Sequence, residues 1–268
     1  MSQILNDFSP QTLIASIKAN LFAYHEYLGH SPKAEFHEDS HLKWVLTGIP
    51  FSFLNNVLDT HLTSDNVDEV IQQTLASFRS RNITRVSWWT EPGTLPTDLG
   101  EHLVVHGLIF EDEEPGMAVD LLELREVSTP SGLTIKRVDG VEILRDFVHS
   151  AAIGFGLPES SESICFDLFS GLGFDLPLNN FVGYLGEEPV ATAELFLGAG
   201  VAGIYWVSTL PKVRHKGIGS AITQAALQQA REMGYHIGIL HSSEQGMGVY
   251  RQLGFVEKCR MSHYVWKS

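Results

Sequence analysis

The sequence is short of basic residues and of cysteine. Of its 268 residues, 18 are Lys or Arg and 32 are Asp or Glu, which gives a formal net charge of −14. Such a surface repels phosphate backbones, so we expect no nucleic-acid partner. The two cysteines, Cys165 and Cys259, are far apart and form no CxxC pair. We expect both to be buried free thiols, in keeping with a cytoplasmic protein.

Long apolar runs are also missing. No uninterrupted run approaches the roughly 20 residues that cross a bilayer. The first residues, Met1 to Asp7, lack the basic start and the apolar stretch of a signal peptide. These absences predict a chain without a membrane association. The apolar fraction of 44% is typical of a globular protein, and the length suits one large domain or two of ordinary size.

What is present is a pattern of hydrophobic periodicities that falls into two halves. In the first half we expect helices over 10–28, 65–81 and within 95–106, the second of them capped by Ser64 and Asp65. Strands are expected over 42–47, 53–58 and 83–89, with a polar loop over 29–40 and an extended segment over 108–122 that is broken at 111–115.

The second half follows a Ser-, Thr-, Pro- and Gly-rich linker over 125–132. Here we expect strands over 133–138, 180–185, 190–197, 201–209, 236–241 and 255–265, and helices over 141–153, 160–170, 217–233 and 245–253. The two halves share an order of elements, and His106-Gly107-Leu108-Ile109 mirrors Leu253-Gly254-Phe255-Val256. This pattern favours a tandem pair, with domains over 1–125 and 132–268.

The turn after the expected strand 201–209 is the most informative segment. It carries Arg214, His215 and Lys216 and the glycines 217 and 219, and a helix begins there. The first N–H groups of a helix have no internal partners, so an anion can bind them. Glycine lets the backbone approach a phosphate closely, and the basic side chains add donors. The turn could hold a pyrophosphate, although an ordinary tight turn before an amphipathic helix has the same pattern.

Two segments in this order resemble the GNAT superfamily of N-acetyltransferases. Arg214-x-x-Gly217-x-Gly219 resembles the family's acetyl-CoA signature, (Q/R)xxGx(G/A), and 246–255 resembles a second conserved segment that ends in Tyr-x-x-Leu-Gly-Phe. The hairpin over 181–192 is similar to the strand pair that precedes the binding strand. The resemblance implies a GNAT-like α/β fold with a mixed α+β sheet in the second half, acetyl-CoA as co-substrate and no metal.

The resemblance also implies roles for individual residues. The backbone of 207–209 would bind the pantetheine arm like an added strand, and 214–220 would hold the pyrophosphate. Ser243 and Gly246 depart from the family, in which many members have Asn and Ala at these positions. The cofactor-binding residues implied in this way are Val207, Ser208, Thr209, Arg214, His215, Lys216, Gly217, Ile218, Gly219, Ser220, Ser243 and Gly246.

The implied reaction is direct attack of a neutral amine on the thioester carbonyl. Tyr250 would protonate the departing thiolate as general acid, and a backbone N–H of the splayed strand would stabilise the oxyanion. Some relatives have a carboxylate early on the binding strand, where this sequence has Gly203. Glu194 on the neighbouring strand is the candidate general base. An ion-paired surface glutamate fits that position equally well, and a water chain could take the proton instead.

The first half looks like a degenerate copy. Ser64, Asp65 and Asn66 precede its long helix where the phosphate-binding turn would be, and an aspartate there repels phosphate. Aligning Gly107 with Gly254 places Leu103 opposite Tyr250, so the copy has no acid.

Several alternatives stay open at this point. The chain could be a non-catalytic acyl-CoA sensor, or it could use a longer acyl-CoA. His37-Glu38-Asp39-Ser40-His41 matches the zinc-protease motif HExxH. That motif needs both histidines on one face of a helix, whereas Pro32 and an expected loop argue against a helix here. The acceptor and the oligomeric state are left undetermined by the sequence.

Overall fold

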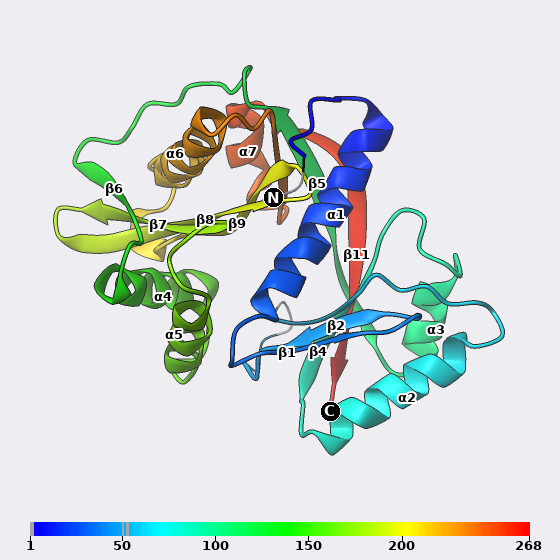
Figure 1. The fold of residues 1–268 in the computed structure, drawn as a ribbon. Helices are drawn as coiled ribbons and strands as arrows, with labels where there is room; N and C mark the ends of the chain where they lie inside the picture. Colours follow the sequence, from blue (N-terminus) through cyan, green and yellow to red (C-terminus); the bar gives the residue numbers. More distant parts are fainter. Residues whose placement is uncertain (1–2, 50, 52–53) are drawn as a thin grey trace. The chain divides into compact units, whose positions relative to one another are not determined.

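The computed structural model describes residues 3–49, 51 and 54–268, which form two compact units. Unit 1 consists of Met1–Tyr24 and Pro115–Cys259, and unit 2 of His25–Glu114 and Arg260–Ser268. Figure 1 shows the fold, coloured along the sequence from the N-terminus to the C-terminus. In the part of the chain that the structure describes, no helix is long and apolar enough to span a membrane.

Unit 1 is built on a mixed sheet with strand order β5-β10-β9-β8-β7-β6. Its strands are β5 (Ile109–Asp120), β6 (Leu133–Arg137), β7 (Leu178–Leu185), β8 (Glu188–Gly198), β9 (Val201–Thr209) and β10 (Ile237–His241). The β9–β10 pair is parallel, and the other pairs are antiparallel.

Helices cover both faces of this sheet. The helices of unit 1 are α4 (Val141–Phe155), α5 (Ser161–Leu172), α6 (Ile218–Glu232) and α7 (Met247–Leu253), with the short 3₁₀ turn η2 (Pro211–Val213). Figure 1 shows α6 on one side of β7, β8 and β9 and α4 and α5 on the other. Alternate residues of β8 such as Ala193 and Leu195 pack in the core with α6. Glu194 therefore points to the opposite face.

Helix α1 (Pro10–Leu28) begins in unit 1 and ends in unit 2. Its Asn20 is fully buried. The Asn20 amide donates to the Gly198 carbonyl (2.8 Å), and its carbonyl oxygen accepts from the Tyr205 hydroxyl (2.8 Å). Tyr24 stacks on Tyr205, with ring centroids 4.0 Å apart. The start of the chain is therefore an integral part of unit 1.

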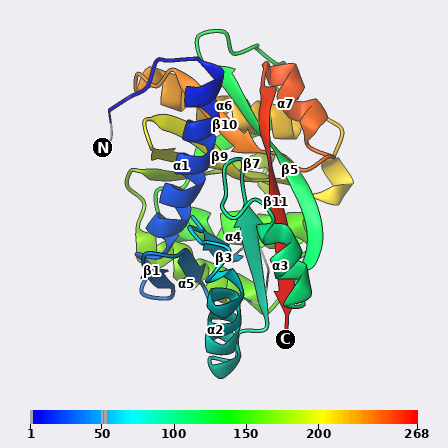
Figure 2. The ribbon, with the colours of Figure 1, turned by 90° about the vertical axis from the view of Figure 1, so that its right-hand side faces the viewer.

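Unit 2 has a five-stranded order, β1-β2-β3-β4-β11, among the described residues. Its strands are β1 (Glu35–Glu38), β2 (Lys43–Leu46), β3 (Asn55–Leu58), β4 (Arg85–Thr90) and the end of β11 (Val256–Lys267). Helices α2 (Val67–Ser80) and α3 (Leu99–Val105) share one core with these strands, which includes Ile71, Phe78, Leu103 and Trp88. Figure 2 shows these helices beside the strands of their unit.

The similarity expected between segments 106–109 and 253–256 has a structural counterpart. Helices α3 and α7 both end at a left-handed glycine, Gly107 (φ 88°) and Gly254 (φ 101°). Each end is closed by the same bond, from the Leu108 N–H to the Leu103 carbonyl and from the Phe255 N–H to the Tyr250 carbonyl. Leu103 thus occupies in α3 the position of Tyr250 in α7.

The strands that follow these two helices complete the sheets. The end of β5 pairs with β10 in unit 1, and the end of β11 pairs with β4 in unit 2. Each half of the sequence thus contributes its last strand to the sheet of the other half. The ranges 1–125 and 132–268 stay a prediction about the two repeats, because packing alone groups the residues differently.

Three local expectations are wrong. The polar loop expected over 29–40 contains β1, which pairs antiparallel with β2 through Glu35–Leu46 and Glu38–Lys43. Strand β1 is only partly buried, so it lacks the apolar signal of a strand. The break expected at 111–115 does not occur, since β5 is continuous. Helix α2 begins at Val67 after Asn66, and no side chain caps it. Phe53, the expected start of a strand, lies outside the described residues.

Replacing Asn20 by alanine is predicted to destabilise unit 1. The substitution leaves the buried Gly198 carbonyl and the Tyr205 hydroxyl without their partner, which should cost about 1–3 kcal/mol. Chemical unfolding followed by tryptophan fluorescence measures the change. Asn6→Ala, at an exposed position before α1, is the control and should stay within about 0.5 kcal/mol of the wild type. Equal stability of the two variants would show that α1 is not needed for the packing of unit 1.

Candidate functional site

In the sheet of unit 1, the parallel strands β9 and β10 pair over a short stretch and then separate. Strands β9 and β10 pair only at Ala202–Gly238, Gly203–Ile239 and Ile204–Leu240. Strand β9 continues to Thr209 while paired with β8 on its other edge. The backbone edge of 205–209 that faces away from β8 can therefore pair with an extended ligand.

A bulge marks the point of parting. The register between β8 and β9 shifts between Thr192 and Glu194, and Trp206 has a positive φ of 48°. The Thr192 hydroxyl donates to the Trp206 carbonyl (2.7 Å). Phe155 and Phe169 pack edge-on against the Trp206 ring, at centroid distances of 5.5 and 5.3 Å. These contacts hold a backbone conformation that a bulky residue rarely adopts.

The open edge of β9 leads directly to the start of α6. A Cβ atom added to Gly219 would lie 3.5 Å from the Thr209 hydroxyl oxygen. Gly217 precedes α6 with φ 79°, and no side chain caps the helix. Residues 214–217 are exposed. The exposed turn thus leads to helix N–H groups that no side chain caps, and such groups suit an anion.

Arg214 has a structural role in this turn. Its Nε donates to the Thr209 carbonyl (3.0 Å), and its Nη2 donates to the Gly154 carbonyl at the end of α4 (3.0 Å). The guanidinium therefore ties the turn to β9 and α4. His215 has a positive φ of 61°, and Lys216 is exposed beside it.

Tyr250 lies on α7 and is 8% exposed. Its ring packs edge-on against Phe255, and a Cβ atom added to Gly246 would lie 3.1 Å from the Tyr250 ring. Because residue 246 is a glycine, the Tyr250 ring can lie close to the backbone at the first turn of α7. The Ser243 hydroxyl accepts a bond from the Gly246 N–H (3.2 Å). Ser243 therefore closes the start of α7.

Glu194 is completely buried and is not a surface residue. It stands opposite Tyr205 of β9 and Asn180 of β7. Burial raises the pKa of Glu194 to about 8, and the nearby Tyr24 hydroxyl lowers it in part. Among the described side chains, none meets full hydrogen-bond geometry with either carboxylate oxygen. The structure therefore groups Glu194 with tyrosines of α1 and β9, while Tyr250 belongs to the cluster around α7.

Residues of this cluster were not predicted from the sequence. Asn20 occupies the space in front of Gly203, since a Cβ atom added to Gly203 would lie 2.1 Å from the Asn20 carbonyl oxygen. An acidic side chain at 203 would collide with α1. The Trp206 indole N–H donates to the Tyr24 hydroxyl (2.8 Å). Neither contact has a local sequence signal, because α1 is about 180 positions away from β9 in the sequence.

His241 is a further residue that sequence reasoning missed. It ends β10 at the point where β9 parts from it. Leu240 packs in the core with α6, so His241 points to the face that also carries Glu194. Burial lowers the pKa of His241 to about 4. The imidazole is therefore neutral near pH 7.

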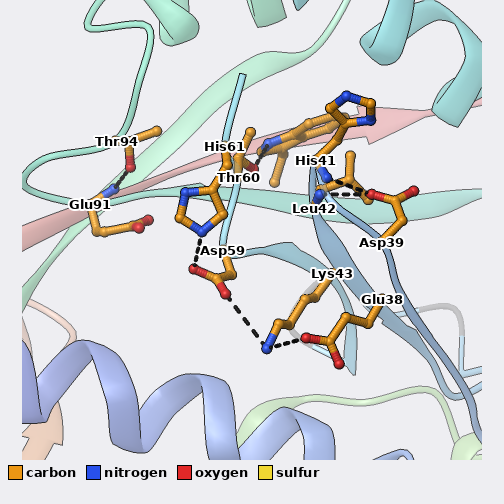
Figure 3. A network of polar contacts seen from close by, with 11 residues as sticks. Glu38, Asp39, His41, Leu42, Lys43, Asp59, Thr60, His61, Glu91 and Thr94 are labelled. Carbon is orange, nitrogen blue, oxygen red and sulfur yellow. Dashed lines mark hydrogen bonds and ion pairs between the residues drawn. The ribbon is translucent and has the colours of Figure 1, made fainter. Parts of the chain in front are cut away.

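The HExxH segment of unit 2 forms a hairpin. His37 lies in β1 and stacks on Trp44 of β2, with centroids 5.0 Å apart. Figure 3 shows that Glu38 pairs with Lys43 (2.9 Å) and that the Asp39 carboxylate accepts the N–H groups of His41 and Leu42. The two histidines do not share a helix face, which excludes the zinc-protease geometry. Over the described residues, no three His, Cys, Asp or Glu side chains converge to hold a metal.

The degenerate turn of unit 2 closes on itself. The Asn66 side chain accepts the N–H of Thr63 (2.8 Å) ahead of α2. Like α6, α2 begins without a side-chain cap, but Asp65 and Asn66 stand before it where unit 1 has its glycine-rich turn.

Comparison with known proteins agrees with this geometry. Residues 148–255 match the model of the acetyltransferase (GNAT) family. A search of curated proteins found none that matches this sequence. The solved structure of a GCN5-related N-acetyltransferase from Kribbella flavida is 22% identical, with 93% of this chain and 96% of that chain covered and a TM-score of 0.69.

Two further structures cover the whole length. A GCN5-related N-acetyltransferase from Sphaerobacter thermophilus is 13% identical, with 100% of this chain and 95% of that chain covered and a TM-score of 0.65. A tandem GNAT protein from the clavulanic acid biosynthesis pathway is 11% identical, with 99% and 97% covered and a TM-score of 0.60. The fold is that of GNAT proteins over both halves, and residues 148–255 match the GNAT family model. The family match over residues 148–255 supports acyl transfer from acetyl-CoA.

The raised pKa of Glu194 predicts a pH-dependent stability. The pKa of this carboxyl is about 8 in the folded state and has its ordinary value of 4.5 in the unfolded state. Wild-type stability therefore falls by about 1.4 kcal/mol per pH unit as the pH rises from roughly 4.5 to 8. Glu194→Gln removes this loss. Its melting temperature relative to the wild type should therefore be higher at pH 9 than at pH 5. If the melting temperatures of the two proteins differed by the same amount at both pH values, the conclusion that Glu194 is a buried, neutral carboxyl would be wrong.

Proposed function

We propose that the chain is an N-acetyltransferase that moves the acetyl group of acetyl-CoA to an amine of a small molecule or a peptide. One observation carries the proposal: the unpaired edge of β9 beyond Ile204 ends at the uncapped start of α6. An extended arm followed by a pyrophosphate has matching chemistry. The arm can pair with a strand edge, and the phosphates can accept from helix N–H groups.

In this proposal the pantetheine arm pairs with the backbone of 207–209, and the pyrophosphate is bound by 216–220. The exposed Lys216 side chain adds positive charge, and the exposed His215 ring adds a hydrogen-bonding nitrogen. Arg214 holds the turn in place through the carbonyls of Thr209 and Gly154.

The chemistry requires that a proton leave the amine and that another reach the sulfur. We assign the second step to Tyr250 as general acid, because α7 and Gly246 hold its ring in one orientation. We assign the first to Glu194 as proton acceptor. Its carboxylate is fully buried, so the proton travels to it through an intervening water or hydroxyl. Glu194 ionises at about pH 8, near the pH at which a general base works best.

Titration calorimetry with acetyl-CoA tests the binding half of the proposal. We expect micromolar binding by the wild type and at least a tenfold loss in Gly217→Glu, because the new carboxylate repels the pyrophosphate. Gly234→Glu is the matched control: Gly234 is also exposed, has a similar φ of 88° and follows the other end of α6. If Gly234→Glu lost affinity to the same degree, strain and not the anion site would explain the effect.

A panel of amines tests the chemical half. Release of the CoA thiol would be followed with spermidine, kanamycin, amino acids and a peptide with a free N-terminus. With the best acceptor, Tyr250→Phe should lower kcat by about 100-fold while the affinity for acetyl-CoA is kept. Tyr184→Phe, which removes a hydroxyl that donates to Asp146 (2.7 Å) on the α4 side of the sheet, should retain turnover. Full turnover of Tyr250→Phe at all pH values would end the acid role, and binding without turnover of any amine would favour an acyl-CoA sensor.

A further inference from the structure

The segment that joins the two halves of the sequence is packed against unit 1. The sequence predicts a linker over 125–132, but the structure holds residues 124–130, here called the strap, on α6 and α7. Leu124 is buried in the core of unit 1, and Val127 packs against the same core. The strap is therefore an ordered part of unit 1, to which all of its residues belong.

Gln224 of α6 binds the backbone of the strap at two points. Its side-chain oxygen accepts the Val127 N–H (3.3 Å), and its side-chain nitrogen donates to the Arg125 carbonyl (3.2 Å). Gln224 is 7% exposed, so water has little access to either bond. A primary amide carries both a donor and an acceptor, and here it serves an N–H and a carbonyl of the strap as a neighbouring strand would. One side chain thus fixes the position of the strap along α6.

The two ends of the strap reach the two helices of the proposed site. At its start, the Arg125 N–H donates to the Leu253 carbonyl (3.1 Å) at the end of α7, where helix carbonyls have no partner within the helix. At its end, the Pro130 ring lies beside the turn before α6, since a Cβ atom added to Gly217 would lie 3.8 Å from Pro130 Cγ. The strap thus joins the helix that carries Tyr250 to the glycine turn.

The glycine turn is a segment for which such a contact matters. Gly217 is exposed and has a φ of 79°. Glycine loses more conformational freedom on ordering than any other residue, so a glycine turn binds an anion more tightly when it is ordered beforehand. Arg214 already ties the turn to β9 and α4. Pro130 is a rigid contact from the strap, because its ring fixes its own φ and its carbonyl accepts the Leu133 N–H (3.1 Å).

We propose that the strap orders the phosphate-binding turn before the cofactor arrives, and that Gln224 is the positioning residue that holds the strap there. This inference rests on the proposed binding of the acetyl-CoA pyrophosphate at 216–220. It gives the segment between the two repeats a part in cofactor affinity. No residue of the strap takes part in the chemical step, so the expected effect is on the affinity for acetyl-CoA and not on kcat.

The test compares Gln224→Met with Gln228→Met. Methionine is similar in length to glutamine and lacks the amide, so Gln224→Met removes both bonds to the strap and keeps most of the packing. Gln228 lies one turn further along α6 and is half-buried, so Gln228→Met makes the same chemical change on the same helix. Titration calorimetry measures the affinity for acetyl-CoA. Nitrogen-15 relaxation of the free protein measures the order parameters of the Gly217 and Gly219 amides.

We expect Gln224→Met to raise the dissociation constant for acetyl-CoA about tenfold, because binding must then order a backbone residue that the strap no longer holds. The order parameters of the Gly217 and Gly219 amides should fall in this variant, while that of Gly234, beyond the other end of α6, stays unchanged. Gln228→Met should match the wild type in both measurements. A role of Gln224 in stability alone would move neither quantity in a folded variant.

An unchanged dissociation constant in Gln224→Met would overturn the inference, as would a loss of affinity with unchanged order parameters at the turn, or an equal loss in Gln228→Met. A wild type that does not bind acetyl-CoA refutes the proposed function itself, and the role of the strap falls with it. If Gln224→Met does not fold, Pro130→Gly replaces it. That variant removes the ring beside Gly217 and should lower both affinity and order parameters, and the inference is wrong if it lowers neither.

Discussion

The parting of β9 from β10 is the constraint on which the rest of unit 1 depends. Two parallel strands that pair at only three positions leave one backbone edge without a neighbour beyond Ile204. In a sheet buried on both faces such an edge is costly unless something pairs with it. A bound cofactor arm would satisfy it. Much of the surrounding structure keeps the two strands apart: the bulge at Trp206, the Thr192 bond to its carbonyl, and the aromatic rings of α4 and α5 around its indole.

The same bulge links the two sides of the sheet. On the side of α6, the strand leads to a helix start that no side chain caps. On the other side, Trp206 donates to Tyr24, and Tyr24 stacks on Tyr205, the cross-strand neighbour of Glu194. A single irregularity in β9 thus lies between the turn before α6 and the face of the sheet that carries Glu194. Because α1 supplies Tyr24 and Asn20, the first half of the chain contributes to the buried cluster on this face of β9.

Helix bounds and turns could be predicted from the sequence, whereas contacts between distant segments could not. Helix α1 has the expected bounds, and the expected echo of 106–109 and 253–256 corresponds to two helices that end at left-handed glycines, Gly107 and Gly254. The position of Glu194 depends on the register of β8, and that register could not be fixed from alternation alone. The contacts of Asn20 and Tyr24 join segments more than 170 residues apart. Strand β1 was missed because a half-exposed edge strand has polar residues on both faces.

Hydrogen–deuterium exchange of the whole chain, with and without acetyl-CoA, is the most direct measurement of the central claim that the open edge of β9 and the start of α6 form the cofactor site. The account predicts slower exchange in the presence of acetyl-CoA at the amides of 207–209 and 217–220, with no change at the turn before α2, where Asn66 already accepts the Thr63 N–H. Protection at the turn before α2, or none at 207–209 and 217–220, would contradict it.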